Sequence, residues 1–188
     1  LNVLSIIDPA GDVLCRYAKL HPFSFAKESD HYDPGEGIFS CRIHGVTVTP
    51  FICYDLRFPE VFRIPARQTQ VYLVPANWPA TRTDHWDALL KARAIENQAF
   101  VVGVNRVGRA KSLEHTGHSA VYGPLGERLG FAGETAGLTT VRIDPAEVAR
   151  VRAEFPVLPD MKKPGATPLL QHRFYRPVDQ ADAETDAT

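Results

Sequence analysis

Cys53 is the side chain of this sequence best suited to nucleophilic chemistry. The strand-like run 46–53 ends at this cysteine, and Pro59 beyond it favours the first turn of a helix, so the thiol is expected at a strand-to-helix junction. The positive end of a helix dipole favours the thiolate, which is the attacking form of cysteine. Proteins also commonly bury free cysteines in an inert form, and Cys15 and Cys41, each within a strand-like run, fit that interpretation better.

Lys19 could supply a fixed cation beside a developing oxyanion, because it lies where a strand-like run enters the long loop 19–37. A single lysine is otherwise a solvated surface residue, and the same holds for Glu28 and the neighbouring loop charges. A further alternative is a hydrolase of a different fold that uses a cysteine–histidine pair in place of the cysteine and lysine considered so far. No sequence context singles out a general base among the histidines, which include His21, His85, His115 and His118.

The composition is that of a globular protein. Hydrophobic residues make up 44% and charged residues 23% of the 188 residues, which excludes a disordered or collagen-like chain. The net charge of −1 does not indicate nucleic-acid binding, and no apolar run is long enough to span a membrane. The three cysteines form no C-x-x-C pair or zinc-ligand spacing. We therefore expect no disulfide framework, no metal and no cofactor, and a reducing, cytoplasmic location.

The chain begins at Leu1 within a strand-like run, and its one methionine is Met161. The start lacks the basic region and cleavage signature of a signal peptide. We therefore expect the natural start of the protein to lie upstream of Leu1.

Strand-like and helix-like runs alternate along the chain, which indicates an α/β protein with mixed sheets. Periodicity predicts a strong helix over 82–98, on which Arg93 and Glu96 are neighbours with a structural role, and a shorter helix over 145–154. Strands are expected over 2–7, 13–18, 38–43, 46–53, 71–75, 100–104, 118–122, 127–131 and 138–143. Residues 156–188 are expected to form an extended Pro-rich tail, disordered after about residue 177.

Six segments, in order and spacing, resemble the nitrilase (carbon–nitrogen hydrolase) superfamily: 17–21, 28–35, 52–60, 76–80, 90–98 and 117–119. The resemblance covers residues 1–155, which we take as the carbon–nitrogen hydrolase domain. It implies an α-β-β-α sandwich that lacks its N-terminal strand–helix portion, and a homodimer when the protein is full length.

The resemblance also implies roles for residues at matching positions. Cys53 would attack the amide carbon to form a thioester and release ammonia. Lys19 and the backbone N–H of Tyr54 would stabilise the oxyanion, and Glu28 would be the supporting glutamate. The general-base glutamate of the family falls upstream of Leu1. We therefore expect this chain alone to be inactive and poorly soluble, and the full-length protein to be an amidase.

The segment Cys53–Glu60 resembles the group of omega-amidases and deaminated-glutathione amidases, and Asn77-Trp78-Pro79 resembles the bacterial omega-amidase branch. This implies a small carboxylate-bearing amide of the 2-oxoglutaramate type as substrate. Arg57 is a candidate partner for its carboxylate, or else part of a structural salt bridge.

Asn77 and Trp78 are candidates for substrate binding, although Trp78 would also fit the core. Two alternatives remain open at this point. One is a deaminated-glutathione amidase or another carbon–nitrogen hydrolase. The other is an inactive fragment or pseudoenzyme that acts through interactions.

Overall fold

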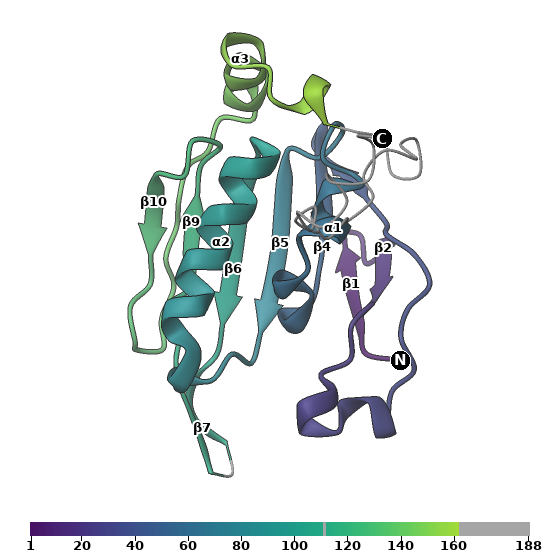
Figure 1. The fold of residues 1–188 in the computed structure, drawn as a ribbon, viewed down its shortest axis with the longest axis vertical. Coiled ribbons are helices and arrows are strands. Elements are labelled where there is room, and N and C mark those ends of the chain that lie inside the picture. Colours follow the sequence, from purple (N-terminus) through teal and green to yellow (C-terminus); the bar gives the residue numbers. More distant parts are fainter. Residues whose placement is uncertain (111, 162–188) are drawn as a thin grey trace, which may run out of the picture.

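The computed structural model describes residues 1–110 and 112–161. Its centre is a six-stranded mixed sheet in the order β10-β9-β6-β5-β4-β3 (Figure 1). The strands β4, β5 and β6 are parallel, and antiparallel pairs flank them on both sides. The predicted α/β class with mixed sheets is confirmed. The bounds are β3 (Cys41–Ile43), β4 (Val46–Pro50), β5 (Val71–Ala76), β6 (Phe100–Asn105), β9 (Ala120–Tyr122) and β10 (Arg128–Phe131).

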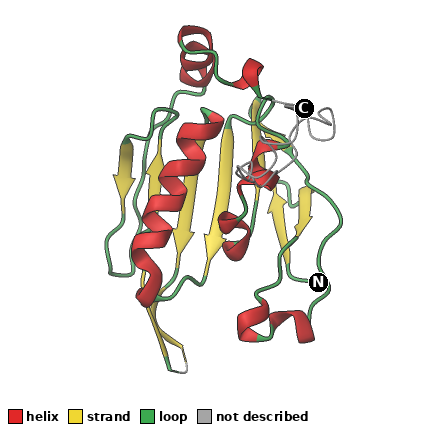
Figure 2. Ribbon diagram, in the orientation of Figure 1, coloured by secondary structure: helices red, strands yellow, loops and turns green. Residues whose placement is uncertain are grey.

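The helix α2 (Thr83–Asn97) lies across one face of this sheet, as Figure 2 shows. Trp86 and Leu90 are completely buried between α2 and the sheet. A Cβ atom at Gly103 of β6 would collide with both side chains, so glycine permits this close approach. The predicted helix over 82–98 therefore forms because its apolar stripe covers the sheet.

The shorter helices are α1 (Pro59–Arg63), which begins at the proline that marked the expected junction, and α3 (Ala146–Glu154). Arg152 of α3 donates hydrogen bonds to carbonyl oxygens of the 66–69 and 97–98 segments. The 3₁₀ segment Leu158–Asp160 follows, and Leu158 is buried. The rest of the predicted tail, including the region expected to be disordered, lies outside the described residues.

A separate hairpin of β1 (Val3–Ile7) and β2 (Val13–Ala18) lies beside the β3–β4 edge of the large sheet. Its second strand ends next to Lys19, whose loop contains the 3₁₀ segments Ser24–Ala26 and Glu28–Asp30. The hairpin therefore brings the candidate lysine from outside the main sheet to the end of β4.

Two predictions about strands were wrong. Residues 138–143 form no strand, although the Val141 side chain packs directly against Gly130 of β10. Residues 105–117, expected to be a loop, contain a second hairpin of β7 (Val107–Ala110) and β8 (Leu113–Thr116). This hairpin extends from the end of β6 (Figure 1).

Among the described residues, no helix combines the length and the apolar character needed to cross a bilayer.

Candidate active site

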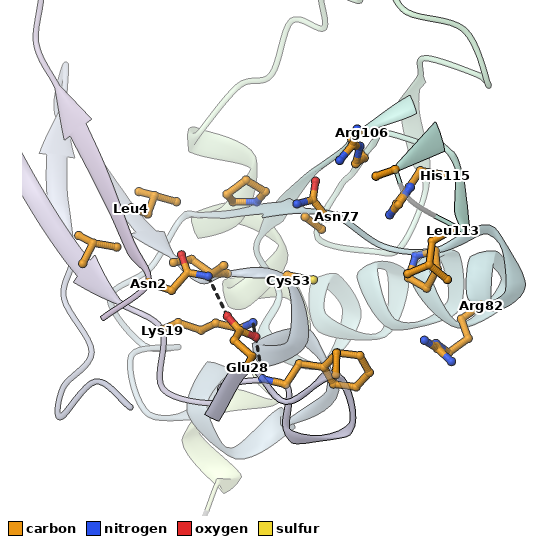
Figure 3. Close-up of a pocket in the computed structure, with 18 residues that line it drawn as sticks. Asn2, Leu4, Lys19, Glu28, Cys53, Asn77, Arg82, Arg106, Leu113 and His115 are labelled. Carbon is orange, nitrogen blue, oxygen red and sulfur yellow. Dashed lines mark hydrogen bonds and ion pairs between the residues drawn. The ribbon is translucent and has the colours of Figure 1, made fainter. Parts of the chain in front are cut away.

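Cys53 begins the 3₁₀ segment Cys53–Arg57, shortly after β4 ends at Pro50. Its φ is +47°, in the left-handed region that side chains other than glycine rarely occupy. The preceding residue, Ile52, is still extended, so the backbone reverses sharply at the cysteine. Strained backbone of this kind costs on the order of 1–3 kcal/mol and is concentrated at functional sites. The turn presents the sulfur to a cavity of about 680 Å³ (Figure 3).

The cavity lies where the parallel strands end. Cys53 follows β4, Asn77 directly follows β5, and Arg106 directly follows β6. All three residues line the cavity. Because parallel strands share one carboxyl edge, residues far apart in the sequence meet there, as is typical of ligand sites on such sheets.

Lys19 and Glu28 lie on one side of Cys53 in the same cavity. The Lys19 Nζ is 2.6 Å from the Glu28 Oε2. The carboxylate also accepts hydrogen bonds from the Asn2 side chain at 2.9 Å and from the Phe23 backbone N–H at 2.7 Å. Lys19 is only 3% exposed. The structure thus brings together the three candidate residues named from the sequence, Cys53, Lys19 and Glu28, and holds the lysine through the glutamate.

Electrostatics at the sulfur differ from the helix-dipole expectation. Burial raises the pKa of the Cys53 thiol, and the Lys19 charge and the Asn77 backbone N–H only partly offset this. The raised pKa favours the thiol over the thiolate form of Cys53. Burial also raises the pKa of Glu28, but hydrogen bonds from Lys19, Asn2 and Phe23 outweigh it and leave that pKa below its usual value.

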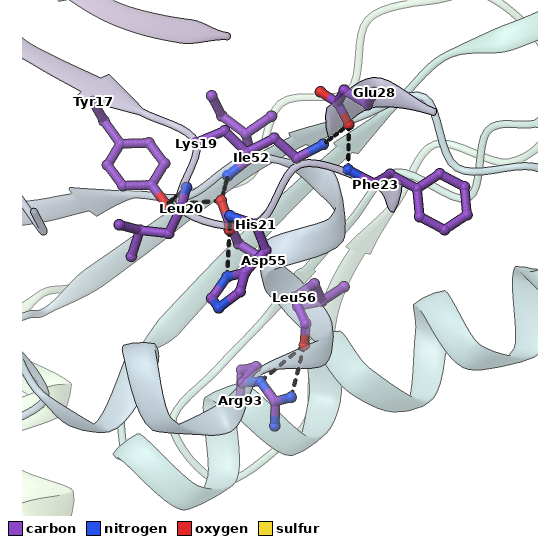
Figure 4. A network of polar contacts seen from close by, with 10 residues as sticks. All are labelled: Tyr17, Lys19, Leu20, His21, Phe23, Glu28, Ile52, Asp55, Leu56 and Arg93. Carbon is purple, nitrogen blue, oxygen red and sulfur yellow. Dashed lines mark hydrogen bonds and ion pairs between the residues drawn. The ribbon is translucent and has the colours of Figure 1, made fainter. Parts of the chain in front are cut away.

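Asp55, to which the sequence analysis gave no separate role, connects the lysine strand to the nucleophile turn (Figure 4). It is completely buried. Its Oδ2 accepts hydrogen bonds from the Tyr17 hydroxyl at 2.7 Å and the Ile52 N–H at 3.0 Å. Its Oδ1 accepts the His21 N–H at 3.0 Å and lies 2.9 Å from the His21 Nδ1. Since Tyr17 and His21 flank Lys19, one carboxylate fixes the Lys19 segment and the Cys53 turn relative to each other.

A second buried anchor holds the other end of the turn. The Arg93 guanidinium donates to the Leu56 carbonyl through Nε at 3.1 Å and Nη2 at 2.7 Å. Its Nη1 lies 3.0 Å from Glu96, so the two residues are the neighbours that their spacing predicted. Arg93 thereby ties the turn after Cys53 to α2, as Figure 4 shows.

The remaining predicted residues lie in different places. Asn77 lines the cavity, whereas Arg57 and Trp78 do not. Trp78 is buried, and its Nε1 donates to the Arg82 carbonyl at 2.7 Å. Arg57 lies over the Trp78 ring, 4.7 Å from its centroid, and its Nη2 is 3.2 Å from the His85 Nδ1. Tyr54 follows Cys53 in the turn, and its ring packs on Phe23 and Phe58.

Besides Arg106, the basic side chains of Arg82 and His115 also line the cavity. The two arginines belong to no segment that carried a functional assignment, so the sequence offered no signal for them. Glu28 is the one carboxylate among the lining residues in the described part of the chain. Within residues 1–110 and 112–161, no group of three or more His, Cys, Asp or Glu side chains could hold a metal ion.

Curated relatives match most of this chain. The 2-oxoglutaramate amidase of Bacillus subtilis (strain 168) is 37% identical over 163 residues, covering 86% of this chain and 63% of the relative. Omega-amidase YafV of Escherichia coli (strain K12) is 38% identical over 162 residues, covering 85% and 62%. Deaminated glutathione amidase of Synechocystis sp. (strain PCC 6803 / GT-S) is 36% identical over 173 residues, covering 84% and 62%. The chain therefore spans less than two thirds of the length of these relatives.

Solved structures also match most of this chain. XC1258 from Xanthomonas campestris, a CN-hydrolase superfamily protein with an arsenic adduct in its active site, has a TM-score of 0.78 at 36% identity, covering 82% of this chain and 61% of that one. A variant of the Nesterenkonia sp. AN1 amidase has a TM-score of 0.71 at 33% identity, covering 81% and 59%. That amidase carries the acetamide moiety of fluoroacetamide covalently on its active-site cysteine.

The predicted nitrilase-like fold is thereby confirmed, and the coverage is consistent with the expected truncation. The carbon-nitrogen hydrolase family model matches residues 1–153. The chain belongs to the carbon-nitrogen hydrolase family.

Proposed function

We propose that this chain provides the nucleophile and oxyanion site of an amidase that acts through a Cys53 thioester. The observation that carries the proposal is the left-handed turn that presents the Cys53 sulfur to the cavity lined by the Lys19–Glu28 ion pair. The cysteine covalently modified in the Nesterenkonia amidase supports the assignment of the nucleophile.

In the proposed reaction, the Cys53 sulfur adds to the amide carbon as a base takes the thiol proton. The Lys19 ammonium and the Tyr54 backbone N–H stabilise the resulting oxyanion. The C–N bond then breaks, the nitrogen leaves as ammonia with that proton, and a thioester remains. Water next adds to the thioester carbon, the C–S bond breaks, and the carboxylate and the free thiol are released.

Glu28 is poorly suited to be the base, because its three hydrogen-bond donors stabilise its charged form. No other carboxylate lines the cavity in the described part of the chain. We therefore assign the base to a carboxylate supplied from beyond these residues. A positioned general base contributes typically about 10²–10⁴-fold to the rate, so the 188-residue chain is expected to turn over amides very slowly.

For the substrate we propose a small amide that carries a carboxylate, of the 2-oxoglutaramate type. The names of the Bacillus subtilis and Escherichia coli relatives support this choice. Deaminated glutathione is the second candidate, supported by the name of the Synechocystis relative. Both substrates release a carboxylic acid from an amide, so the cavity chemistry above serves either.

The nucleophile is tested by treating the purified chain with fluoroacetamide and locating the adduct by peptide mass mapping. We expect alkylation at Cys53, its loss in Cys53→Ala, and its retention in the matched control Cys41→Ala. Failure to modify Cys53 while the other thiols react would contradict the assignment.

The reaction is tested by ammonia release from 2-oxoglutaramate and deaminated glutathione, using this chain and a form extended through its natural upstream sequence. We expect turnover of 2-oxoglutaramate by the extended form alone. Robust turnover by the 188-residue chain would exclude an external base. An extended form that is alkylated at Cys53 but hydrolyses neither amide would favour a non-catalytic role.

A further inference from the structure

The cavity has a second polar end, separated by Cys53 from the Lys19–Glu28 pair (Figure 3). Arg82 belongs to the 3₁₀ segment Ala80–Arg82, Arg106 follows β6, and His115 lies on β8. All three line the same cavity. They come from separate elements, which the fold brings together beside the nucleophile.

These groups lack partners within the described chain. Over residues 1–110 and 112–161, neither the Arg82 nor the Arg106 guanidinium forms a hydrogen bond or an ion pair; Arg82 lies only over the Phe23 ring, 5.9 Å from its centroid. His115 is 5% exposed, and its buried Nδ1 has no hydrogen-bond partner there. Buried polar groups are nearly always paired, so an unpaired one beside a cavity calls for a ligand or another explanation.

The charge balance of the cavity favours an anion at this end. Glu28, the one carboxylate lining the cavity in the described part, is already paired with Lys19. The two arginines therefore leave an uncompensated positive charge. Burial lowers the pKa of Arg57, and the positive charge of Arg82 lowers it further. Arg57 itself packs over Trp78 and is not among the residues that line the cavity.

We propose that Arg82 and Arg106, assisted by His115, form the subsite that binds the carboxylate on the acyl portion of the substrate. This inference rests on the proposed amidase function and names how that site recognises the acid end of its substrate. Guanidinium groups suit the task because their planar donors can bind a carboxylate in a bidentate manner.

Apolar side chains also line the cavity, with Leu4 on the side of Asn2 and Leu113 beside His115 (Figure 3). A substrate with its amide at Cys53 and its carboxylate at the arginines would place its methylene groups within this partly apolar cavity. The site should therefore distinguish the monoamide of a dicarboxylic acid from a neutral amide of equal length.

The experiment measures binding to the purified 188-residue chain, so it does not depend on catalysis. Glutarate, a dicarboxylate, and glutaramide, its neutral diamide, are titrated by calorimetry into the wild type, Arg82→Gln and Arg106→Gln. The matched control is Arg109→Gln, an exposed arginine on β7 that does not line the cavity. Thermal unfolding establishes that each variant is folded.

We expect the wild type to bind glutarate more tightly than glutaramide, and each cavity variant to weaken glutarate binding at least about tenfold, as for loss of a charge-assisted hydrogen bond. Arg109→Gln should stay within about twofold of wild type. Equal binding of the two ligands, undetectable glutarate binding, or equal effects of all three substitutions would overturn the subsite. If glutarate binding depends on the arginines but fluoroacetamide spares Cys53, the subsite stands and the amidase proposal fails. If fluoroacetamide modifies Cys53 but glutarate binding does not depend on the arginines, the amidase proposal stands and the subsite fails.

Discussion

The two ends of the cavity are built differently. On the Lys19 side, nearly every charge has an intramolecular partner: Lys19 pairs with Glu28, and Asp55 accepts bonds from Tyr17, Ile52 and His21. On the other side, the described chain leaves Arg82 and Arg106 without ion pairs. Groups that stabilise a reacting centre work best when they are fixed beforehand, whereas groups that recognise a charged ligand must keep their donors available. The difference in pairing therefore separates a proposed catalytic end from a proposed recognition end.

The largest expected effect comes from removing the fixed cation. Lys19→Ala in the extended, active form should lower kcat about 10²–10³-fold, because one oxyanion donor is lost. Ammonia release from 2-oxoglutaramate measures this, and Lys91→Ala, an exposed lysine on α2, is the matched control. An active Lys19→Ala enzyme would show that this end does not serve the oxyanion.

The substitution Asp55→Asn tests whether the Asp55 carboxylate holds together the Lys19 side of the cavity. The amide keeps the size of the side chain but loses the charge-assisted bonds to Tyr17, Ile52 and His21, so the free energy of unfolding should fall by about 2–3 kcal/mol. Urea denaturation gives the value. Asp33→Asn, at an exposed position, should change stability by less than about 0.5 kcal/mol. Equal stability of the two variants would mean that Asp55 does not hold this end together.

His118 is a titratable side chain that lies outside both ends of the cavity. Its Nδ1 is 2.9 Å from Asp87 and its Nε2 is 3.4 Å from Glu134. Although burial lowers the pKa of His118, the two carboxylates outweigh it and raise that pKa above its ordinary value of 6.5. Since the folded pKa is raised, the stabilisation is fully present below about pH 6.5 and is lost as the pH rises through the folded pKa.

The free energy of unfolding of the wild type should therefore fall relative to that of His118→Asn between about pH 6 and pH 8, by under about 1 kcal/mol. Asparagine is the chosen replacement because His118 has a φ of +59°, which asparagine tolerates better than most residues. Denaturation at a series of pH values measures the difference, and parallel pH profiles would contradict it.

The smallest effect is expected at the unpaired end. Arg106→Gln should leave the free energy of unfolding within about 0.5 kcal/mol of wild type, since its exposed side chain has no partner in the described structure to lose. Urea denaturation beside Asp55→Asn makes the contrast direct. A loss of 2 kcal/mol or more, of the order expected for Asp55→Asn, would mean that Arg106 is structural.

Local pattern was enough to predict α2 and the central strands, because their apolar residues repeat with the period that burial on the sheet requires. It failed for residues 138–143, because their β-rich composition is the same whether or not the segment pairs with a neighbouring strand. The β7–β8 hairpin was missed because its short strands are mostly exposed and carry no apolar alternation.

The candidate site likewise contains residues that local sequence patterns identify and residues that they do not. Cys53, Lys19 and Glu28 lie in segments with a recognisable resemblance, and the structure places them in one cavity. That Arg82 and Arg106 line one cavity depends on the parallel pairing of β5 and β6, which aligns Ala76 with Asn105. No pattern along the chain contains that information. Arg57, the arginine nearest the motif in sequence, lies over the Trp78 ring, and its assignment to the substrate carboxylate stays a prediction.

The left-handed backbone at Cys53 has a consequence for how this position can change over time. Selection for stability alone would favour glycine there, since glycine adopts such a φ without steric cost. A lineage that no longer used the thiol would therefore gain stability by replacing it, and the replacement would be accepted easily. Retention of a side chain at this turn is thus a marker of continued use of the site, readable from the sequence of any descendant.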